Sequence, residues 1–168
     1  RNPLIHCITN YVSINDCANI VLACGGAPIM AEDINEVSQI TSICQGLDIN
    51  IGMLNDNKLS SMLKAGATAN ELGIPVILDP VGAGSSDYRI KAVQNLMSNV
   101  QFGVIRGNVS EIKAIAVKQG IHNIAAGVYE TMQKDRSAMG VEAGVADKIT
   151  DDNIKEMADF INKLSQKT

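Results

Sequence analysis

Short apolar runs alternate along the chain with longer segments whose apolar residues recur every three or four positions. Runs of branched apolar residues predict buried strands, and the longer spacing predicts helices with one buried face. The expected strands are residues 4–9, 27–31, 47–54, 74–79 and 101–107. The expected helices are residues 13–26, 34–46, 55–73, 87–100, 108–117 and 150–167. This alternation predicts an α/β domain whose central sheet is mainly parallel and flanked by helices.

Two of these elements carry more specific expectations. The helix at 13–26 can be capped by Ser13 and ended by Gly25. Its expected buried face consists of Ile14, Ala18, Val21 and Leu22. The strand at 74–79 is an unbroken apolar run, which predicts that both of its faces are covered.

The pattern becomes irregular between residues 119 and 149, and no strand follows the helix at 150–167. Because an alternating fold returns from a helix to its sheet, we expect the C-terminal part of the fold to lie outside these 168 residues. Residues 1–168 are therefore predicted to form a single, incomplete α/β domain.

The composition narrows the class of protein. A chain of 168 residues with 46% hydrophobic and 19% charged residues is typical of one folded globular domain. A net charge of -4 without a basic stripe argues against a nucleic-acid partner. No apolar run approaches the roughly 20 residues that a membrane-spanning helix needs, so no membrane partner is expected. The first residues lack the pattern of a secretory signal, and the expected compartment is the cytoplasm.

The cysteines and one histidine are expected to be structural. Cys7, Cys17, Cys24 and Cys44 lack C-x-x-C spacing, which gives little support to a zinc site or a redox pair. Each lies in an apolar stretch, so we expect buried thiols. His6 also lies within an apolar run and is expected to be a hydrogen-bonded core residue rather than a base.

Polar residues and glycines follow each of the five expected strands. In open α/β sheets, ligands bind beyond the carboxyl ends of the strands. The residues at these ends are Thr9 and Asn10, Met30 and Glu32, Asn50 and Gly52, Asp79, and Arg106, Gly107 and Asn108. The pattern favours a site along this edge, although strand ends are polar in most folds.

The segment "DPVGAGSSDYR" (79–89) allows two interpretations. Asp79 before Pro80 can simply begin a turn. Alternatively, Gly82 and Gly84 allow backbone N–H groups to approach an anion just before a helix. No Gly-Lys-Ser/Thr follows these glycines, which excludes a P-loop, and their spacing does not fit G-x-G-x-x-G.

The segment "GVIRGNVSEI" (103–112) is similarly open. Asn108 as N-cap and Glu111 three residues later have the spacing of a capping box, and capping alone would account for both. In the functional interpretation, Glu111 beside Asn108 holds Mg²⁺ through waters while Arg106 pairs with a phosphate.

Taken together, five segments resemble the hydroxyethylthiazole kinase family of thiamine salvage, a member of the ribokinase-like superfamily. They are "PLIHCITNYV", "GGAPIMAED", "LDINIGML", "ANELGIPVILDPVGAG" and "VIRGNVSEI". The specific part is the joint occurrence of "DPVGAG" and "RGN-x-x-E", since N-x-x-E helices occur across the superfamily. The resemblance implies a ribokinase-like layered fold.

The resemblance also implies a reaction, the transfer of the γ-phosphoryl group of ATP to the hydroxyl of 4-methyl-5-(2-hydroxyethyl)thiazole. The family's positions fall on Asn10, Met30 and Gly52 for the thiazole, on Asp79 and Glu111 for Mg²⁺, and on Arg106 and Asn108 for ATP. Asn108 would also help to hold the metal, and Met30 would pack its thioether against the thiazole ring.

The resemblance implies a homotrimer with sites between subunits. It also implies a nucleotide-contacting Thr/Ser-Gly turn and a Gly-x-Gly-Cys anion hole, both expected beyond Thr168. No catalytic residue is assigned, and the 168 residues alone are expected to lack the groups aimed at the transition state. Two alternatives stay open: another ribokinase-like vitamin-precursor kinase, and a catalytically silent truncated form that only binds ligand.

Overall fold

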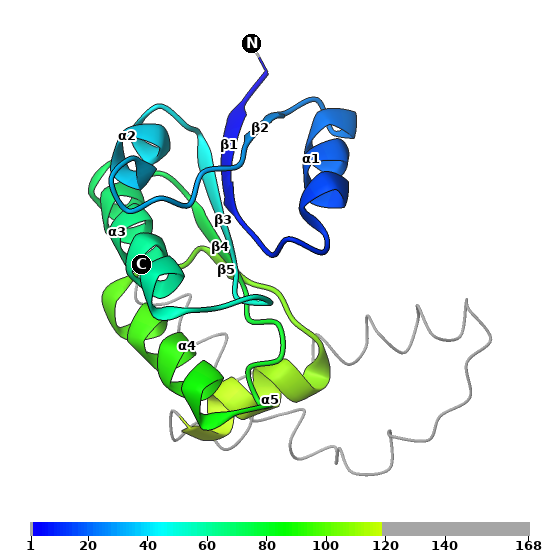
Figure 1. Cartoon of the computed structure of the whole chain (residues 1–168), viewed down its shortest axis with the longest axis vertical. Helices are drawn as coiled ribbons and strands as arrows, with labels where there is room; N and C mark the ends of the chain where they lie inside the picture. The colour runs from blue at the N-terminus through cyan, green and yellow to red at the C-terminus, as the bar shows by residue number, and fades with distance from the viewer. Residues whose placement is uncertain (1, 119–168) are drawn as a thin grey trace, which may run out of the picture. The chain divides into compact units, whose positions relative to one another are not determined.

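Figure 1 shows the computed structural model of the chain, in which residues 2–118 are described. Within these residues, a five-stranded sheet runs in the order β2-β1-β3-β4-β5, and its neighbouring strands are all parallel. The strands are β1 (Leu4–Ile8), β2 (Ala27–Ile29), β3 (Gly46–Asn50), β4 (Val76–Asp79) and β5 (Val104–Ile105). The helices are α1 (Ile14–Ala23), α2 (Val37–Ser42), α3 (Asp56–Glu71), α4 (Asp87–Asn99) and α5 (Val109–Lys118).

The chain divides into two compact units, Arg1–Glu111 and Ile112–Thr168. The sheet, α1 to α4 and the first turn of α5 all belong to the first unit. The expectation that residues 1–168 form one domain stays a prediction.

The direction of the crossovers explains which helices cover which face of the sheet. The chain moves one way from β1 to β2 and the opposite way from β2 to β3, β4 and β5. Because crossovers between parallel strands are right-handed, α1 must lie on the face opposite to α2, α3 and α4. Figure 1 shows α1 alone on one side of the sheet and α2, α3 and α4 on the other.

The face of the sheet beneath α3 holds the core of the first unit. Side chains alternate along a strand, so Leu47 and Ile49 of β3 share this face with Val76 and Leu78 of β4. These four side chains are at most 1% exposed, and α3 adds Met62, which is completely buried. Packing of α3 on β3 and β4 therefore removes a continuous apolar surface from water.

Local signals define both ends of α3. The Asn55 side chain accepts a hydrogen bond from the Lys58 backbone N–H at 2.9 Å, which satisfies one of the unpaired donors at the start of the helix. After the helix, Gly73 adopts a φ of +67°, a left-handed conformation that glycine enters without strain. The helix expected at 55–73 is confirmed almost to its ends.

His6 is a core residue, as the sequence predicts. Its Nε2 lies 2.8 Å from the carbonyl oxygen of Ala31, and its Nδ1 lies 2.8 Å from Oγ1 of Thr41. A carbonyl oxygen can only accept, so Nε2 carries the proton and donates it, and Nδ1 of the neutral ring accepts from the threonine hydroxyl. Burial lowers the pKa of His6 below its usual value, against smaller opposing effects of Ala31 and the charge of Glu36.

The opposite face of the sheet is only partly covered within residues 2–118. Ile77 on β4 is 41% exposed and its neighbour Val104 on β5 is 52% exposed. The expectation that the strand at 74–79 is covered on both faces is therefore wrong for the described part of the chain. Only one face of β4 is packed against helices here. On the other face of the sheet, α1 covers the side of β2 and β1 and does not extend over β4.

Two further expectations need correction at the edges of elements. The strand expected at 47–54 ends at Asn50, because the Asn50 side chain accepts a hydrogen bond from Gly52 N at 2.8 Å and turns the chain. Ser13 stands at the start of α1 without capping it, since its hydroxyl donates to Oδ1 of Asn10 at 3.0 Å instead. Leu22, expected on the buried face of α1, is 56% exposed.

The remaining expectations about elements are confirmed or untested. All five expected strands and the first five expected helices are present, most of them shorter than the sequence pattern. The irregular region 119–149 and the helix expected at 150–167 lie outside the described residues. None of the helices described between residues 2 and 118 combines the length and the apolar character required to traverse a membrane.

Candidate functional site

The five strand ends named from the sequence form one row along the carboxyl edge of the sheet. In the spatial order of the strands, the row runs through Met30, Asn10, Asn50, Asp79 and Arg106. The direction of the chain changes between β1 and β3, which carry Asn10 and Asn50. Parallel strands on either side of such a reversal leave a crevice between their connections, and this is where open α/β sheets bind ligands.

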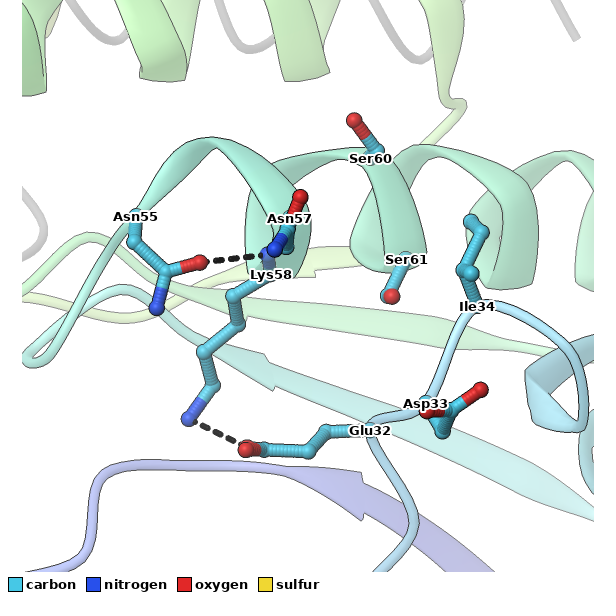
Figure 2. Close-up of a pocket in the computed structure, with 8 residues that line it drawn as sticks. All are labelled: Glu32, Asp33, Ile34, Asn55, Asn57, Lys58, Ser60 and Ser61. Carbon is cyan, nitrogen blue, oxygen red and sulfur yellow. Dashed lines mark hydrogen bonds and ion pairs between the residues drawn. The ribbon is translucent and has the colours of Figure 1, made fainter.

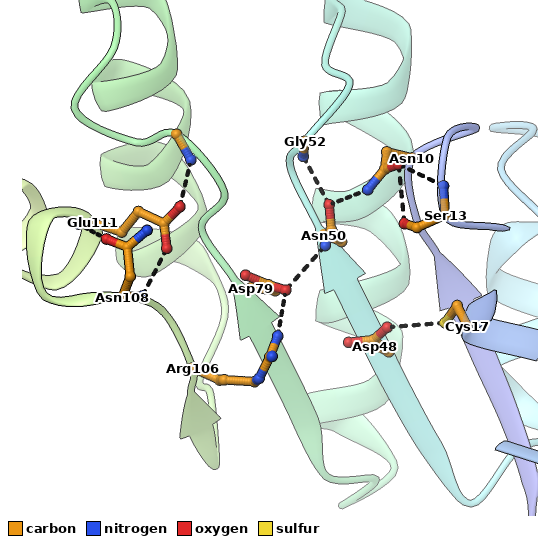
Figure 3. Close-up of polar contacts among 11 residues, drawn as sticks. Asn10, Ser13, Cys17, Asp48, Asn50, Gly52, Asp79, Arg106, Asn108 and Glu111 are labelled. Carbon is orange, nitrogen blue, oxygen red and sulfur yellow. Dashed lines mark hydrogen bonds and ion pairs between the residues drawn. The ribbon is translucent and has the colours of Figure 1, made fainter. Parts of the chain in front are cut away.

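Hydrogen bonds connect four members of this row (Figure 3). Asn10 Nδ2 donates to Asn50 Oδ1 at 3.2 Å, and Asn50 Nδ2 donates to Asp79 Oδ2 at 3.1 Å. Arg106 Nη1 donates to the same Asp79 oxygen at 2.9 Å and forms an ion pair with it. Side chains at or just beyond the ends of β1, β3, β4 and β5 are thereby held in one continuous chain of polar contacts.

Asn50 is the central residue of this chain, and its orientation follows from its partners. Its carboxamide oxygen accepts from Asn10 Nδ2 and from Gly52 N, whereas its NH₂ group donates to the Asp79 carboxylate. A Cβ at position 52 would lie 2.9 Å from Asn50 Oδ1 and 3.0 Å from Asn10 Nδ2. Only glycine allows the backbone to approach these two asparagines so closely.

Asp79 is a half-buried carboxylate, and its neighbours shift its pKa in opposite directions. Desolvation raises its pKa, the Arg106 guanidinium acts against that rise, and the negative charge of Glu111 adds to it. The net result is a pKa above the usual value for an aspartate. Figure 3 shows Asp79 between Asn50 on one side and Glu111 with Asn108 on the other. The two acids named from the sequence therefore lie close enough to affect each other.

Asn108 and Glu111 form the capping box that their spacing predicts. Asn108 Oδ1 accepts from Glu111 N at 3.0 Å, and Glu111 Oε2 accepts in return from Asn108 N at 2.8 Å. The second oxygen of Glu111, Oε1, accepts from the backbone N–H of Gly82 at 2.9 Å. The structural interpretation is thus confirmed, and Glu111 additionally ties the start of α5 to the glycine loop after β4.

The sequence left open whether this glycine loop, residues 80–85, offers free backbone N–H groups to an anion. In the structure, several of these groups are already hydrogen-bonded within the protein. Gly82 has a φ of +66°, and its N–H donates to Glu111. Ala83 N donates to Pro80 O at 3.0 Å, and Ser85 N donates to Gly82 O at 2.9 Å. Three N–H groups of the loop therefore already have acceptors within the chain, because the glycine closes a compact turn.

Comparison with known proteins shows to which family the chain belongs. The sequence model of the hydroxyethylthiazole kinase family matches residues 1–157, nearly the whole chain. The chain belongs to this family.

The relatives support the same assignment. The chain is 54% identical over 167 residues to a hydroxyethylthiazole kinase of Clostridium acetobutylicum, a match that covers 99% of this chain and 55% of the relative. It is 46% identical over 167 residues to a hydroxyethylthiazole kinase of Methanobrevibacter smithii, with the same coverage of 99% and 55%. The chain thus spans about half the length of the curated relatives that it matches.

A solved structure supports the fold. The structure of a hydroxyethylthiazole kinase protein from Pyrococcus horikoshii OT3 is 41% identical and superposes with a TM-score of 0.69, covering 71% of this chain and 47% of that one. The predicted fold class, a ribokinase-like α/β fold with a parallel sheet flanked by helices, is therefore confirmed.

A second polar cluster surrounds Lys58, and the sequence did not predict it. The side chain of Lys58 on α3 is 3% exposed and pairs with Glu32 at 2.7 Å. Lys58 Nζ also donates to the Thr9 carbonyl and lies 4.7 Å from the centre of the Tyr11 ring, while the Tyr11 hydroxyl donates to Glu32. Desolvation opposes ionisation of Glu32, but the hydrogen bonds from Lys58 and Tyr11 prevail and lower its pKa.

The Lys58–Glu32 pair borders an open, polar pocket of about 570 Å³ (Figure 2). The pocket is lined by Glu32, Asp33, Ile34, Asn55, Asn57, Lys58, Ser60 and Ser61. Its walls come from the segment after β2 and the first turns of α3, next to the strand ends that carry Asn10 and Met30. Lys58 gave no sequence signal, because a lysine at the start of a helix is normally solvated.

Cys7, Cys17 and Asp48 form a third cluster on the α1 face of the sheet. Their ligating atoms lie within 4.8 Å of one another, and Cys17 Sγ donates to Asp48 Oδ2 at 3.9 Å. Burial raises the pKa of both thiols and, aided by the nearby charge of Asp79, raises the pKa of Asp48 to about 6. At neutral pH both thiols therefore stay protonated, whereas Asp48 is mostly ionised and accepts the hydrogen bond from Cys17.

The predicted burial of the four cysteines is correct for only some of them. Cys7 and Cys44 are buried, whereas Cys17 is half-buried. Cys24 is exposed, and the expectation of a buried thiol is wrong there. The apolar run that contains Cys24 ends in the turn after α1, where the chain reaches the surface before β2.

Proposed function

We propose that the protein transfers the γ-phosphoryl group of ATP to the hydroxyl of 4-methyl-5-(2-hydroxyethyl)thiazole, a step of thiamine salvage. The observation that supports this most directly is the polar row from Asn10 through Asn50 to Asp79, which lies along the carboxyl edge of the sheet in a member of the hydroxyethylthiazole kinase family. The row has amides at one end and two carboxylates beside a guanidinium at the other. A neutral alcohol and a charged phosphate require such different surroundings.

The thiazole alcohol is assigned to the end of the row at β2, β1 and β3. Met30 follows β2 and is half-buried, Asn10 follows β1, and Gly52 follows β3. A thioether provides a polarisable apolar surface for a heteroaromatic ring. The Asn10 carboxamide and the close backbone at Gly52 provide the polar contacts that would orient the hydroxyl.

Asp79 and Glu111 are the residues that would hold Mg²⁺, with Asn108 beside them. The donor set suits this ion, because carboxylate oxygens are its preferred protein ligands and the remaining positions are usually filled by waters and phosphate. The raised pKa of Asp79 supports the assignment, since a desolvated carboxylate with a second acid nearby is stabilised by a cation. When bound, the ion would neutralise charge on the phosphates.

Arg106 is assigned to the nucleotide phosphates. Its side chain is 76% exposed although it pairs with Asp79 at 2.9 Å. An exposed guanidinium can exchange one anionic partner for another, and its planar geometry suits phosphate oxygens. Asn108, at the start of α5, would contact ATP from the same side.

The reaction forms one bond and breaks another at the γ-phosphorus. The thiazole hydroxyl oxygen bonds to this phosphorus while the bond to the oxygen that bridges the β- and γ-phosphates breaks, so that ADP leaves and the hydroxyl proton is released. Residues of the described unit would contribute by placing the alcohol in line with the phosphate and by neutralising charge. We further propose that the enzyme works in the cytoplasm as a homotrimer, as the family resemblance implies.

The decisive experiment is an assay of the intact natural protein with MgATP and the thiazole alcohol. We expect ADP and thiazole phosphate to form in equal amounts, and ³¹P NMR can measure both products. A hydroxymethylpyrimidine serves as the competing acceptor, and preference for it would replace the proposed substrate with another vitamin precursor. Binding of the thiazole without turnover, in a protein of intact mass near 17.8 kDa, would instead support a silent short form.

Replacing one oxygen of the proposed metal site provides a sharper test. Asp79→Asn should lower kcat by about 100-fold or more, because the variant loses a charge aimed at the metal while keeping the shape that Asn50 and Arg106 contact. Asp87→Asn on the exposed first turn of α4 is the matched control and should leave kcat within about threefold. Unchanged turnover in a folded Asp79→Asn protein would remove Asp79 from the metal site.

A further inference from the structure

Arg89 connects two loops of the site that no strand pairing connects. It lies in the first turn of α4, and its backbone N–H donates to the Ser86 hydroxyl that caps this helix. Its guanidinium reaches back toward the sheet. Nη1 donates to Ile51 O at 2.6 Å and to Val81 O at 2.8 Å, and Nη2 donates to Gly52 O at 2.8 Å.

The three carbonyl oxygens belong to the two loops that the proposed reaction must bring together. Ile51 and Gly52 form the loop after β3, which is assigned to the thiazole alcohol. Val81 is part of the glycine loop after β4, whose next residue, Gly82, donates its N–H to Glu111. One guanidinium thus connects the loop on the acceptor side with the loop that anchors a proposed metal ligand.

The chemistry of arginine suits this connection. Its fixed, planar fork of N–H donors can hold three carbonyl oxygens in one geometry, whereas a lysine ammonium is a flexible point charge. A Cβ added to Gly82 would lie 3.7 Å from Nη1 and 3.9 Å from Cδ of Arg89, so the glycine loop lies directly against the side chain. The half-buried setting makes each of these charge-assisted bonds stronger than it would be in water.

We propose that Arg89 is a positioning residue that sets the separation between the acceptor loop and the glycine loop, and hence the in-line approach of the thiazole hydroxyl to the γ-phosphorus. This inference rests on the proposed function. Arg89 does not contact either substrate in this role. Its effect is therefore on the transfer step rather than on the binding of each substrate alone, since small errors in alignment cost rate.

The test compares Arg89→Met and Arg89→Lys in the intact natural protein with Lys91→Met, an exposed lysine of the same helix, as the matched control. For Arg89→Met we expect kcat to fall about 10- to 100-fold, while the Kd values for the thiazole alcohol and for a non-hydrolysable ATP analogue each change less than about threefold. ATP hydrolysis to water should rise relative to transfer to the alcohol. Arg89→Lys should fall between Arg89→Met and the wild type.

Hydrogen exchange gives a readout that does not depend on the reaction. Peptides covering residues 50–54 and 80–85 should both exchange faster in Arg89→Met than in Lys91→Met, because both loops lose the same support. If Arg89→Met does not fold, Arg89→Lys carries the test.

The failure of this inference is distinguishable from the failure of the proposed function. Wild-type kcat in a folded Arg89 variant, or a loss confined to one Kd, would overturn the positioning role. Lower stability with an unchanged ratio of transfer to hydrolysis would also overturn it, since a purely structural arginine would behave in this way. A wild-type protein that does not phosphorylate the thiazole would overturn the proposed function instead, even if both loops loosen together.

Discussion

At the residue scale, His6 shows how a buried polar side chain is accommodated within a strand. The ring is completely buried, and both nitrogens have partners from other parts of the chain. Donation to the Ala31 carbonyl fixes the neutral tautomer that accepts from Thr41. A second proton on the ring would turn this acceptor into a donor and place a charge in the core.

The lowered pKa of His6 makes folding stability depend on pH. The unfolded chain binds a proton on this ring near pH 6.5, and the folded protein binds it only at lower pH. Protons therefore bind preferentially to the unfolded state as the pH falls below about 6.5, and the contribution of His6 to stability, present above that value, is lost. Urea unfolding at pH 7.5 and 5.5 should show this loss in wild-type protein.

The variant His6→Gln isolates the effect, because glutamine can donate and accept hydrogen bonds without titrating. We expect this variant to be less stable at pH 7.5 and to lose less stability on acidification than the wild type. An identical pH dependence in both proteins would show that His6 does not titrate differently on folding.

At the element scale, the packing of α3 against the end of α4 depends on a glycine. A Cβ at Gly66 would lie 2.5 Å from Cγ2 and 2.7 Å from Cγ1 of Val100, which follows α4 and is buried. These distances are too short for real carbon contacts. Glycine weakens a helix by about 1 kcal/mol relative to alanine, so the close approach of the two elements has an intrinsic cost.

Gly66→Ala should consequently destabilise the protein, although alanine favours the helix. We expect a net loss of about 1–2 kcal/mol, because Val100 is β-branched and cannot move its methyl groups aside cheaply. The Gly66→Ala/Val100→Ala double variant removes the two methyl groups that clash. Its loss of unfolding free energy, measured by denaturant unfolding, should be about 1 kcal/mol smaller than the sum of the two single losses. Additive losses would contradict the contact.

At the scale of the whole molecule, the two faces of the sheet are unequal within residues 2–118. Leu78 on the α3 face is completely buried, whereas the adjacent Ile77 on the other face is 41% exposed. Both belong to β4, whose last residue is Asp79. The rigid support of Asp79 therefore comes mainly from the face packed beneath α3.

Alanine substitutions at these neighbours measure the inequality directly. Leu78→Ala should cost about 2–5 kcal/mol of unfolding free energy, and Ile77→Ala only about 1 kcal/mol, because much of the isoleucine is already in water. Urea unfolding at constant pH provides both values. Equal losses would show that the Ile77 face is covered in the intact protein.

The elements predicted from the sequence within residues 2–118 are confirmed, and the structure brings several of the predicted strand-end residues together. The sequence predicts Asn10, Asp79 and Arg106 at strand ends, and hydrogen bonds join them through Asn50. The sequence identifies Asn50 only as a strand end, because its partners Asn10 and Asp79 lie at the ends of strands that become its neighbours only on folding. Arg89 was missed for the same reason, since an arginine in the first turn of an amphipathic helix is usually solvated.

The order of residues along the chain is sufficient for the succession of strands and helices, the parallel sheet and the membership of the hydroxyethylthiazole kinase family, because periodicity and motif spacing are local properties. Only the three-dimensional structure shows that Glu111 caps α5 and holds Gly82, that Lys58 is buried against Glu32, and that one face of β4 is exposed within residues 2–118. These features depend on contacts between residues far apart in sequence, which are created when the crossovers bring the strand ends to one edge.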